Sequence, residues 1–416
     1  MIKKCIICIT LLTSVIAFSQ RNTSSPYSFY GLGEVKFRGT ESSRAMGGLG
    51  IEGDSISLNL LNPASYSSLR LTSFAVGGTT TFSNLKNESE KEKAKSTSLD
   101  YIAVGIPMGD FGASFGLIPF SAVGYNISNS GEDEFGNQTN KTSFGEGNIN
   151  RFFVGGSYSV NKNLSLGVDL QYNFGNIDTE TIEGISILQL QSRERNSSRI
   201  TGTSFNFGAL YNRKITDKYK LYASLTYSPE AKLTSKNERN LATVTYSSSG
   251  SENINNQEDV VVNDTNLKIP SKLAVGLGIG ETNKWLIGTE VTFQKNSQLV
   301  NRFDDFNNGT YEDSQKYVIG GYYIPKFDSY SSYLSRVVYR AGFRYENIGL
   351  VIKDQSIEDY GMNFGLGLPL GFSKIDLGFE MGVRGTQYNN LIRENYFNIS
   401  VGLSLSDKWF KKRKID

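Results

Sequence analysis

The chain has 416 residues, with 43 glycines, 25 phenylalanines, 23 tyrosines, a formal net charge of +2 and a mean hydropathy of −0.31. It has no histidine, and its 2 cysteines both lie among the first eight residues, so the commonest general base and any disulfide framework are missing from the rest. The near-neutral charge gives no support to nucleic-acid binding. We therefore expect no enzyme, no cofactor and no metal site.

The first element is a secretory leader, predicted over residues 1–19. Two lysines precede a short apolar stretch that ends near Phe18, and the small residues Ala17 and Ser19 stand three and one positions before a cut after Ser19. An N-terminal membrane anchor is the alternative, but the stretch is short for a span and the following residues are polar. Both cysteines precede the cut, so acylation of the mature N-terminus is not expected.

Residues 20–69 differ from everything that follows. They hold turn-forming and small residues with scattered apolar ones, too few for a hydrophobic core of their own. We interpret them as a hatch, or plug, that packs inside a barrel; a loose periplasmic extension is the alternative. The candidate ligand and hatch residues are Tyr27, Phe29, Tyr30, Met46, Gly47, Gly48, Asn62, Pro63 and Ala64.

From residue 70 to 407 the dominant signal is alternation of apolar and polar residues. Between 164 and 175, apolar residues at even positions alternate with polar or small ones such as Asp169. Between 375 and 384 the polar positions hold Asp376, Glu380 and Arg384. These charges indicate a wet interior opposite an apolar exterior, and we read them as lumenal rather than catalytic carboxylates. A β-sandwich also alternates, but its inner face would be buried against a second sheet.

We expect an all-β fold, a transmembrane antiparallel β-barrel of about fourteen strands with the N-terminal hatch in its lumen. The predicted strands are 71–84, 96–108, 111–127, 146–160, 163–176, 199–214, 218–235, 262–280, 283–297, 314–324, 336–347, 357–370, 374–387 and 393–406. The connections alternate between short turns and long polar segments near 85–95, 128–145, 177–198, 236–261 and 298–313. Outer-membrane barrels show this asymmetry, with short turns in the periplasm. The connection at 325–335 is longer than this rule predicts.

The chain ends in Trp409 and Phe410, which suit an interfacial aromatic girdle, and a basic tail over 408–416. That tail is predicted to lie in the periplasm, either against anionic surfaces or simply solvated.

Three short motifs resemble the FadL/TodX family of outer-membrane transporters of hydrophobic compounds, with features similar to its Bacteroidota-type members. The run Ala45-Met46-Gly47-Gly48-Leu49-Gly50, with Asn62-Pro63-Ala64, is similar to the family's hatch signature. The stretch from Leu267 to Lys272 is similar to its mid-barrel segment, and Tyr339-Arg340-Ala341-Gly342-Phe343 to a later strand. The resemblance implies a barrel plugged by its N-terminus, an apolar lumenal pocket, and lateral exit through a kinked third strand.

The third predicted strand offers its own indication of such a gap. Pro119 lies in its middle, a few residues after Gly116, and proline cannot donate a ladder hydrogen bond. We interpret Gly116 and Pro119 as a lateral gate, with a β-bulge as the alternative. Arg340, Arg344 and Glu346 are interpreted as lumenal charges that hold the hatch or a ligand carboxylate.

The preferred function is an outer-membrane channel of a Gram-negative bacterium that takes up hydrophobic, long-chain fatty acid-like molecules and releases them sideways. Its expected partners are membrane lipid, the hydrophobic ligand and other outer-membrane proteins. The alternative is a non-transporting accessory or interaction barrel of a secretion or assembly complex. A general porin fits less well, because a plug blocks free diffusion. A channel should show an apolar pocket between hatch and wall, whereas an interaction subunit should show a filled lumen with elaborated loops or an exposed apolar face.

Overall fold

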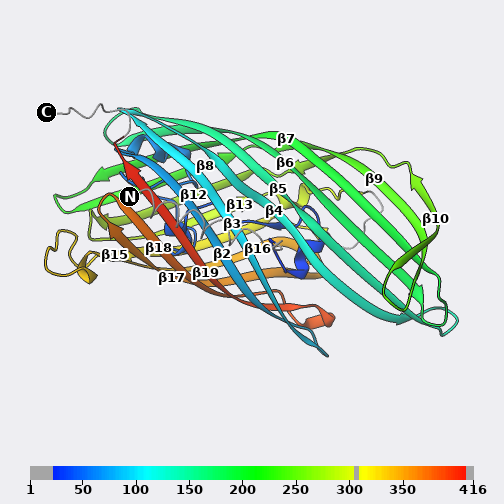
Figure 1. Cartoon of the computed structure of the whole chain (residues 1–416). Helices are drawn as coiled ribbons and strands as arrows, with labels where there is room; N and C mark the ends of the chain where they lie inside the picture. Colours follow the sequence, from blue (N-terminus) through cyan, green and yellow to red (C-terminus); the bar gives the residue numbers. More distant parts are fainter. Residues whose placement is uncertain (1–21, 304–308, 409–416) are drawn as a thin grey trace, which may run out of the picture.

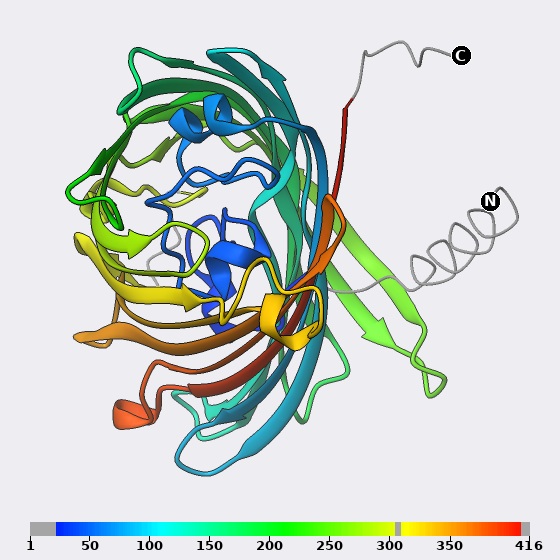
Figure 2. The same ribbon diagram turned by 90° about the vertical axis from the view of Figure 1, so that its left-hand side faces the viewer.

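The computed structural model describes residues 22–303 and 309–408. The predicted leader, the aromatic pair Trp409-Phe410 and most of the basic tail lie outside the described residues. The described chain forms a closed antiparallel barrel with an N-terminal segment in its lumen (Figures 1 and 2). None of its helices is long and apolar enough to cross a membrane.

Fourteen wall strands close the barrel, which confirms the predicted fold and strand number. Two of them are interrupted, so β8 and β9 form one wall strand and β10, β11 and β12 form another. The first half of the wall contains β2 (Thr72–Lys86), β3 (Lys91–Met108), β4 (Phe111–Glu132), β5 (Gln138–Ser159), β6 (Leu164–Ile185), β7 (Gln191–Lys214), β8 (Tyr219–Ser228) and β9 (Ala231–Tyr246).

The second half contains β10 (Glu252–Val260), β11 (Thr265–Ile269), β12 (Lys272–Glu281), β13 (Trp285–Gln294), β15 (Ser314–Tyr323), β16 (Val338–Ile352), β17 (Gln355–Leu370), β18 (Ser373–Arg384) and β19 (Arg393–Asp407). Pairing of β19 with β2 from Asp407↔Thr72 to Arg393↔Lys86 closes the ring. A two-residue strand, β14 (Thr310–Tyr311), adds to β16, and short 3-10 turns η3 (Asn296–Gln298), η4 (Leu334–Arg336) and η5 (Tyr388–Asn390) lie in connections.

The expected alternation places apolar side chains outside and polar ones inside. On β6, Leu166, Val168 and Leu170 are exposed on the outer face, whereas Asp169 and Asn173 are fully buried. Exposed apolar side chains on neighbouring strands continue this belt around the barrel. Such a belt is the surface that a bilayer covers in barrels of this type.

Several predicted outer loops are in fact strands, and this corrects the boundaries from sequence. The pairs β2–β3, β4–β5, β6–β7 and β9–β10 continue until only short tips remain, at 87–90, 133–137, 186–190 and 247–251. Figure 1 shows β4 to β7, β9 and β10 running far to the right of the other strands. Above the belt the outer face of a strand meets water in place of lipid, and near the tips both faces are exposed, so the apolar alternation that marks a strand fades there.

The connection 324–337 projects from the opposite end, where the short turns lie, and contains η4. A backbone hydrogen bond from Lys326 to Ser335, 2.8 Å long, closes its base. It is therefore an ordered loop at the predicted periplasmic end rather than a tight turn.

Candidate functional site

The N-terminal segment, residues 22–71, lies inside the ring of strands (Figure 2). It has little regular structure: η1 (Pro26–Phe29), β1 (Glu34–Val35), α2 (Glu41–Arg44) and η2 (Pro63–Ser68). Its positions with positive φ are glycines, Gly31, Gly33, Gly47 and Gly48, which adopt that conformation without a Cβ clash. The segment is therefore shaped by turns and by contacts with the wall.

Asn62, Pro63 and Ala64 form the junction between η2 and the wall. The Asn62 side chain accepts a hydrogen bond from the Ala64 N–H at 3.0 Å and donates to the carbonyl oxygen of Ala209 at 3.1 Å. Pro63 occupies the first helical position, where a missing N–H costs nothing. At Gly208 on β7, an added Cβ would lie 2.1 Å from Asn62 Oδ1. The motif therefore requires a residue without a side chain at the facing position of the wall.

Met46, Gly47 and Gly48 form a second such contact. The N–H of Gly48 donates to Ser43 O at 2.9 Å, so the left-handed glycines end α2. The chain then runs directly against β16, where a Cβ at Gly342 would lie 2.2 Å from the Met46 carbonyl carbon. Both motifs of the predicted hatch signature are therefore close-packing contacts with the wall.

Buried ion pairs and hydrogen bonds hold the segment to charges on the wall. Arg38 pairs with Asp169 of β6 at 2.5 Å, and Asp169 also accepts a hydrogen bond from the Tyr66 hydroxyl at 3.0 Å. Ser42 donates to Asp376 of β18 at 2.9 Å, and Asp376 pairs with Arg340 at 2.8 Å. Each link between the segment and the wall joins residues more than a hundred positions apart, so the segment and the wall determine each other's position.

The predicted lumenal charges fall into this network with different roles. Arg340 contacts the segment through Asp376, whereas Arg344 pairs with Glu380 at 2.7 Å and with Glu346 at 3.3 Å. The alternating pattern placed Arg384 on the lumenal face with Asp376 and Glu380, but Arg384 was not among the residues predicted to hold the hatch.

Arg384 reaches the N-terminal segment directly. It binds Glu34 at 2.7 Å and Asp359 at 3.0 Å. Although burial opposes ionisation, Lys36 and Arg384 hold the pKa of Glu34 well below its usual range. Glu34 therefore stays charged, and this ion pair fixes β1.

The predicted ligand-contacting aromatics do not meet in one pocket. Tyr27 and Tyr30 pack with Leu350 and its neighbours, and the Tyr27 hydroxyl donates to the Ile392 carbonyl. Phe29 packs against the apolar layer that includes Leu32, and its ring meets the Tyr30 ring edge-on, with 5.2 Å between the centroids. Met46 joins a third cluster around Leu49, Ile51 and Tyr222. The structure thus distributes these side chains over three packed clusters.

The predicted gate lies at a break between β3 and β4. Their pairing runs from Met108↔Phe111 to Ile102↔Leu117 and stops there, although β4 continues to Glu132 beside β5. Gly116 lies within the paired part, opposite Ala103. On the β5 side the register shifts between Pro119 and Ser121, as at a β-bulge. A break on one side of β4 and a bulge on the other therefore occur together.

The free edge of β4 at this break is occupied by the N-terminal segment. Glu34 and Val35 of β1 pair with Ala122 and Ser121, and Lys36 donates its N–H to Phe120 O at 2.9 Å. The N–H of Gly124 donates to the Ser28 hydroxyl at 3.1 Å. We call this region, where β3 leaves β4 and β1 replaces it, the β3–β4 seam.

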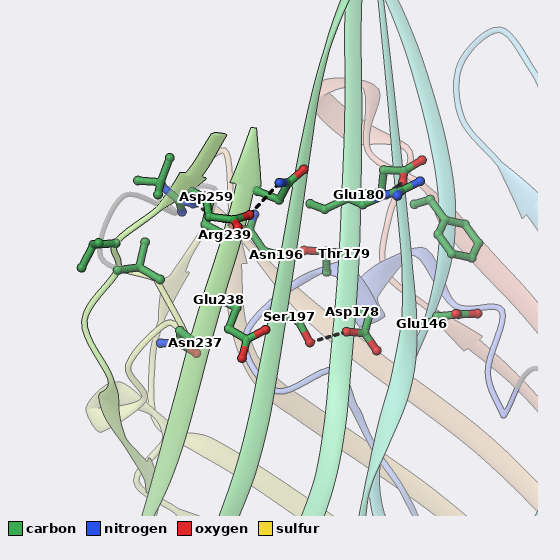
Figure 3. Close-up of a pocket in the computed structure, with 16 residues that line it drawn as sticks. Glu146, Asp178, Thr179, Glu180, Asn196, Ser197, Asn237, Glu238, Arg239 and Asp259 are labelled. Carbon is green, nitrogen blue, oxygen red and sulfur yellow. Dashed lines mark hydrogen bonds and ion pairs between the residues drawn. The ribbon is translucent and has the colours of Figure 1, made fainter. Parts of the chain in front are cut away.

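A cavity of about 720 Å³ lies at the far ends of β5, β6, β7, β9 and β10 (Figure 3). Seven of the sixteen residues that line it are charged, and the Ser197 hydroxyl donates to Asp178 at 2.6 Å. Pockets for hydrophobic compounds are lined mainly by apolar side chains, which this cavity does not match. In the described chain, no group of three or more Cys, Asp or Glu side chains is arranged to hold a metal ion.

The fold and the segment within it define a fourteen-stranded antiparallel β-barrel that holds its own N-terminal segment in the lumen. The Pseudomonas putida toluene transporter TodX shares 16% identity over 91% of this chain and 100% of its own, with a TM-score of 0.60. The Ralstonia pickettii toluene transporter TbuX shares 14% over 89% and 99%, with a TM-score of 0.59. The corresponding values for a Pseudomonas aeruginosa FadL homologue are 11%, 90% and 98%, with a TM-score of 0.55.

These likenesses confirm the predicted FadL/TodX-type fold. The chain itself belongs to the BamG family, whose model matches residues 1–416. No curated protein matches it significantly. The Bacteroidota-type assignment stays a prediction.

Proposed function

We propose that the protein is a non-transporting interaction barrel of an outer-membrane secretion or assembly complex, plugged by residues 20–69. The observation that supports this most directly is that its own N-terminal segment occupies both the lumen and the β3–β4 seam. A route for a ligand needs a lumenal pocket and an exit. Here β1 pairs with the β4 edge, and Tyr27, Phe29 and Met46 belong to three different apolar clusters rather than to one pocket.

The asymmetric height of the wall supports the same proposal. On β6 the last strongly exposed apolar side chain of the belt is Tyr172, yet the strand continues to Ile185 and pairs with β7 throughout. A bilayer needs only about 9–11 residues of each tilted strand. Strands that continue far beyond the membrane create surface for contacts outside it, which transport through the wall does not require.

The test is purification of the full chain in mild detergent from the membranes of the organism that produces it. Mass spectrometry then quantifies co-purifying proteins and small molecules. A stoichiometric protein partner, and no stoichiometric amphiphile, is the expected result. A stoichiometric fatty acid that disappears when Met46 is replaced by Asp, with no protein partner, would overturn the proposal.

A second candidate function is uptake of hydrophobic, fatty acid-like molecules through an outer membrane of Gram-negative type, with lateral exit. The break beside Pro119 supports it, because the wall there depends on β1 alone and a displaced β1 would leave a gap to the lipid. The printed names of TodX and TbuX describe them as toluene transporters. Under this proposal, Pro119→Val lowers uptake several-fold in cells with normal barrel levels. Unchanged uptake would exclude lateral exit.

A further inference from the structure

The tips of two adjacent hairpins carry four large apolar side chains in water. Phe135 in the β4–β5 tip is 88% exposed, and Ile187 in the β6–β7 tip is 75% exposed. Leu188 and Leu190, in the same second tip, are 53% and 49% exposed. We call these four residues the tip patch. Soluble surfaces expose single apolar side chains commonly, but a group of this size at one place indicates a binding surface.

Both tips are held by hydrogen bonds. The Asp133 carboxylate accepts from the Phe135 N–H at 2.9 Å and from the Asn137 N–H at 2.8 Å, which closes the first tip. The Ser186 N–H donates to Gln138 O at 2.8 Å, and Asn140 donates to the Ser186 hydroxyl at 3.1 Å, which ties the second tip to the first. The tip patch is therefore presented on a defined scaffold.

The membrane does not account for the tip patch. Along β4, eighteen residues separate Leu117, the last strongly exposed apolar side chain of the belt, from Phe135, and fifteen separate Tyr172 from Ile187. At about 3.3 Å per residue and the usual tilt, the tips lie roughly 40 Å beyond the belt. The tips also lie at the end opposite the short turns, which in such barrels is the cell exterior.

The charges around the tip patch indicate what binds there. Residues 130–141 and 182–190 contain four carboxylates, Glu132, Asp133, Glu134 and Glu183, against one amine, Lys141, which pairs with Glu183 at 3.2 Å. Hydrogen bonds from Asn137 lower the pKa of Asp133, so it stays charged. A second copy would oppose one acidic rim to another, and an anionic lipid surface would be repelled. A protein with a complementary, basic rim satisfies both features.

We propose that the tip patch and its acidic rim bind an extracellular protein whose apolar face is bordered by lysine and arginine side chains. This inference rests on the proposed interaction role and assigns one surface to it. Apolar contacts at the centre give the affinity, while the carboxylates orient the partner and exclude other ones.

The experiment is photo-crosslinking in intact cells that produce the full chain. Benzoylphenylalanine replaces Phe135 or Leu188 in turn. As the control it replaces Ser248, an exposed residue of the β9–β10 tip, whose residues 247–251 are all serine or glycine. We expect one adduct of the same mass from both test sites and none from the control. The Ile187→Asp substitution should reduce the yield of this adduct more than about tenfold. Addition of 1 M NaCl should reduce the yield several-fold. Ser248→Asp should leave it unchanged.

Identification of the adduct decides the proposal. A protein crosslinked through a surface rich in Lys and Arg supports it. No common adduct, an adduct of twice the chain's mass, a lipid adduct, or an equal adduct from Ser248 overturns it. If Ile187→Asp abolishes the adduct from Phe135 but a protein still co-purifies in detergent, another surface also contributes to the complex. If a protein co-purifies and neither test site crosslinks, the tip patch is excluded and the interaction role stands. If nothing co-purifies, the interaction role itself fails.

Discussion

Asp169→Asn removes the charge that holds Arg38 and should loosen the N-terminal segment from the wall. Asp169 is fully buried, and Arg38 is its ion-pair partner at 2.5 Å. Breaking a buried pair from one side costs roughly 3–5 kcal/mol, because the remaining charge stays desolvated. Since the Arg38 side chain is 17% exposed, we take the lower end, about 3 kcal/mol. The Tyr66 hydroxyl keeps an amide oxygen as its acceptor.

The assay is hydrogen exchange of the purified barrel, followed on peptides from residues 36–69. About 3 kcal/mol corresponds to roughly a 100-fold faster local opening of these peptides, at about 1.4 kcal/mol for each factor of ten. Asp178→Asn is the matched control, the same substitution on the same strand at an exposed side chain. This control should change the hydrogen-exchange rate of the segment by less than about threefold, since exposed polar contacts contribute little to stability.

A double variant separates lost attraction from the cost of an unpaired charge. Arg38→Met with Asp169→Asn should exchange more slowly than Asp169→Asn alone, because no buried guanidinium is then left without a counter-charge. The reasoning is refuted if Asp169→Asn exchanges like Asp178→Asn, or if the double variant shows the summed effects of the two single ones.

Three further predictions concern the same segment. Burial raises the pKa of Glu41 to about 7 from 4.5. The contribution of protonated Glu41 to the free energy of unfolding is therefore fully present below about pH 4.5 and is lost as the pH rises through 7. That is about 3 kcal/mol, so Glu41→Gln should raise Tm by a few degrees at pH 8 and hardly at pH 5. Gly112→Ala should displace η2, since its Cβ would lie 2.1 Å from Tyr66 O, whereas Gly156→Ala, with no atom nearer than 3.9 Å, should not. Arg384→Met should speed tryptic cleavage after Lys36 several-fold, because Glu34 loses its ion pair with the wall, 2.7 Å long, and keeps only the ion pair with Lys36 of its own segment.

Each of these has a contrary result. A Tm difference between wild type and Glu41→Gln that is the same at both pH values would show that another group titrates. Equal exchange of residues 60–70 in Gly112→Ala and Gly156→Ala would show that the wall yields at Gly112. Unchanged cleavage in Arg384→Met, with normal migration of the unheated barrel in gels, would show that pairing with β4 alone holds β1.

The amino-acid sequence determined the fold class through a local property. Alternation with period two reports which face of a strand meets lipid and which meets polar surroundings, as Leu166 to Asn173 show on β6, and it needs no knowledge of distant residues. The inward position of Asp169, Asp376 and Arg340 follows from the same pattern. The number of wall strands follows from counting such runs between turns.

The pattern fails where its physical cause is absent. Above the belt the outer faces of β4 to β7 meet water in place of lipid, and near the tips both faces are exposed. Segments around Ser130 and Glu183 therefore carry no alternation signal, and they were interpreted as loops. In these extensions the strands are held only by hydrogen bonds to neighbouring strands. Which strands pair is a property of the folded chain and cannot be read from a local pattern. The tip patch was hidden for the same reason, because the sequence around Ile187 does not show how far from the membrane it lies.

The candidate site depended on tertiary structure for a different reason. Hatch residues such as Asn62 and Met46 stand out in sequence because close backbone contact restricts them, but what they contact lies on strands more than a hundred residues away. Pro119 indicated a break in the ladder, yet its filling by Glu34 and Val35 comes from an antiparallel pairing across the lumen. Sequence determined which residues face inward; only the closed barrel decided which of them meet, because ion pairs and strand additions join segments brought together by ring closure.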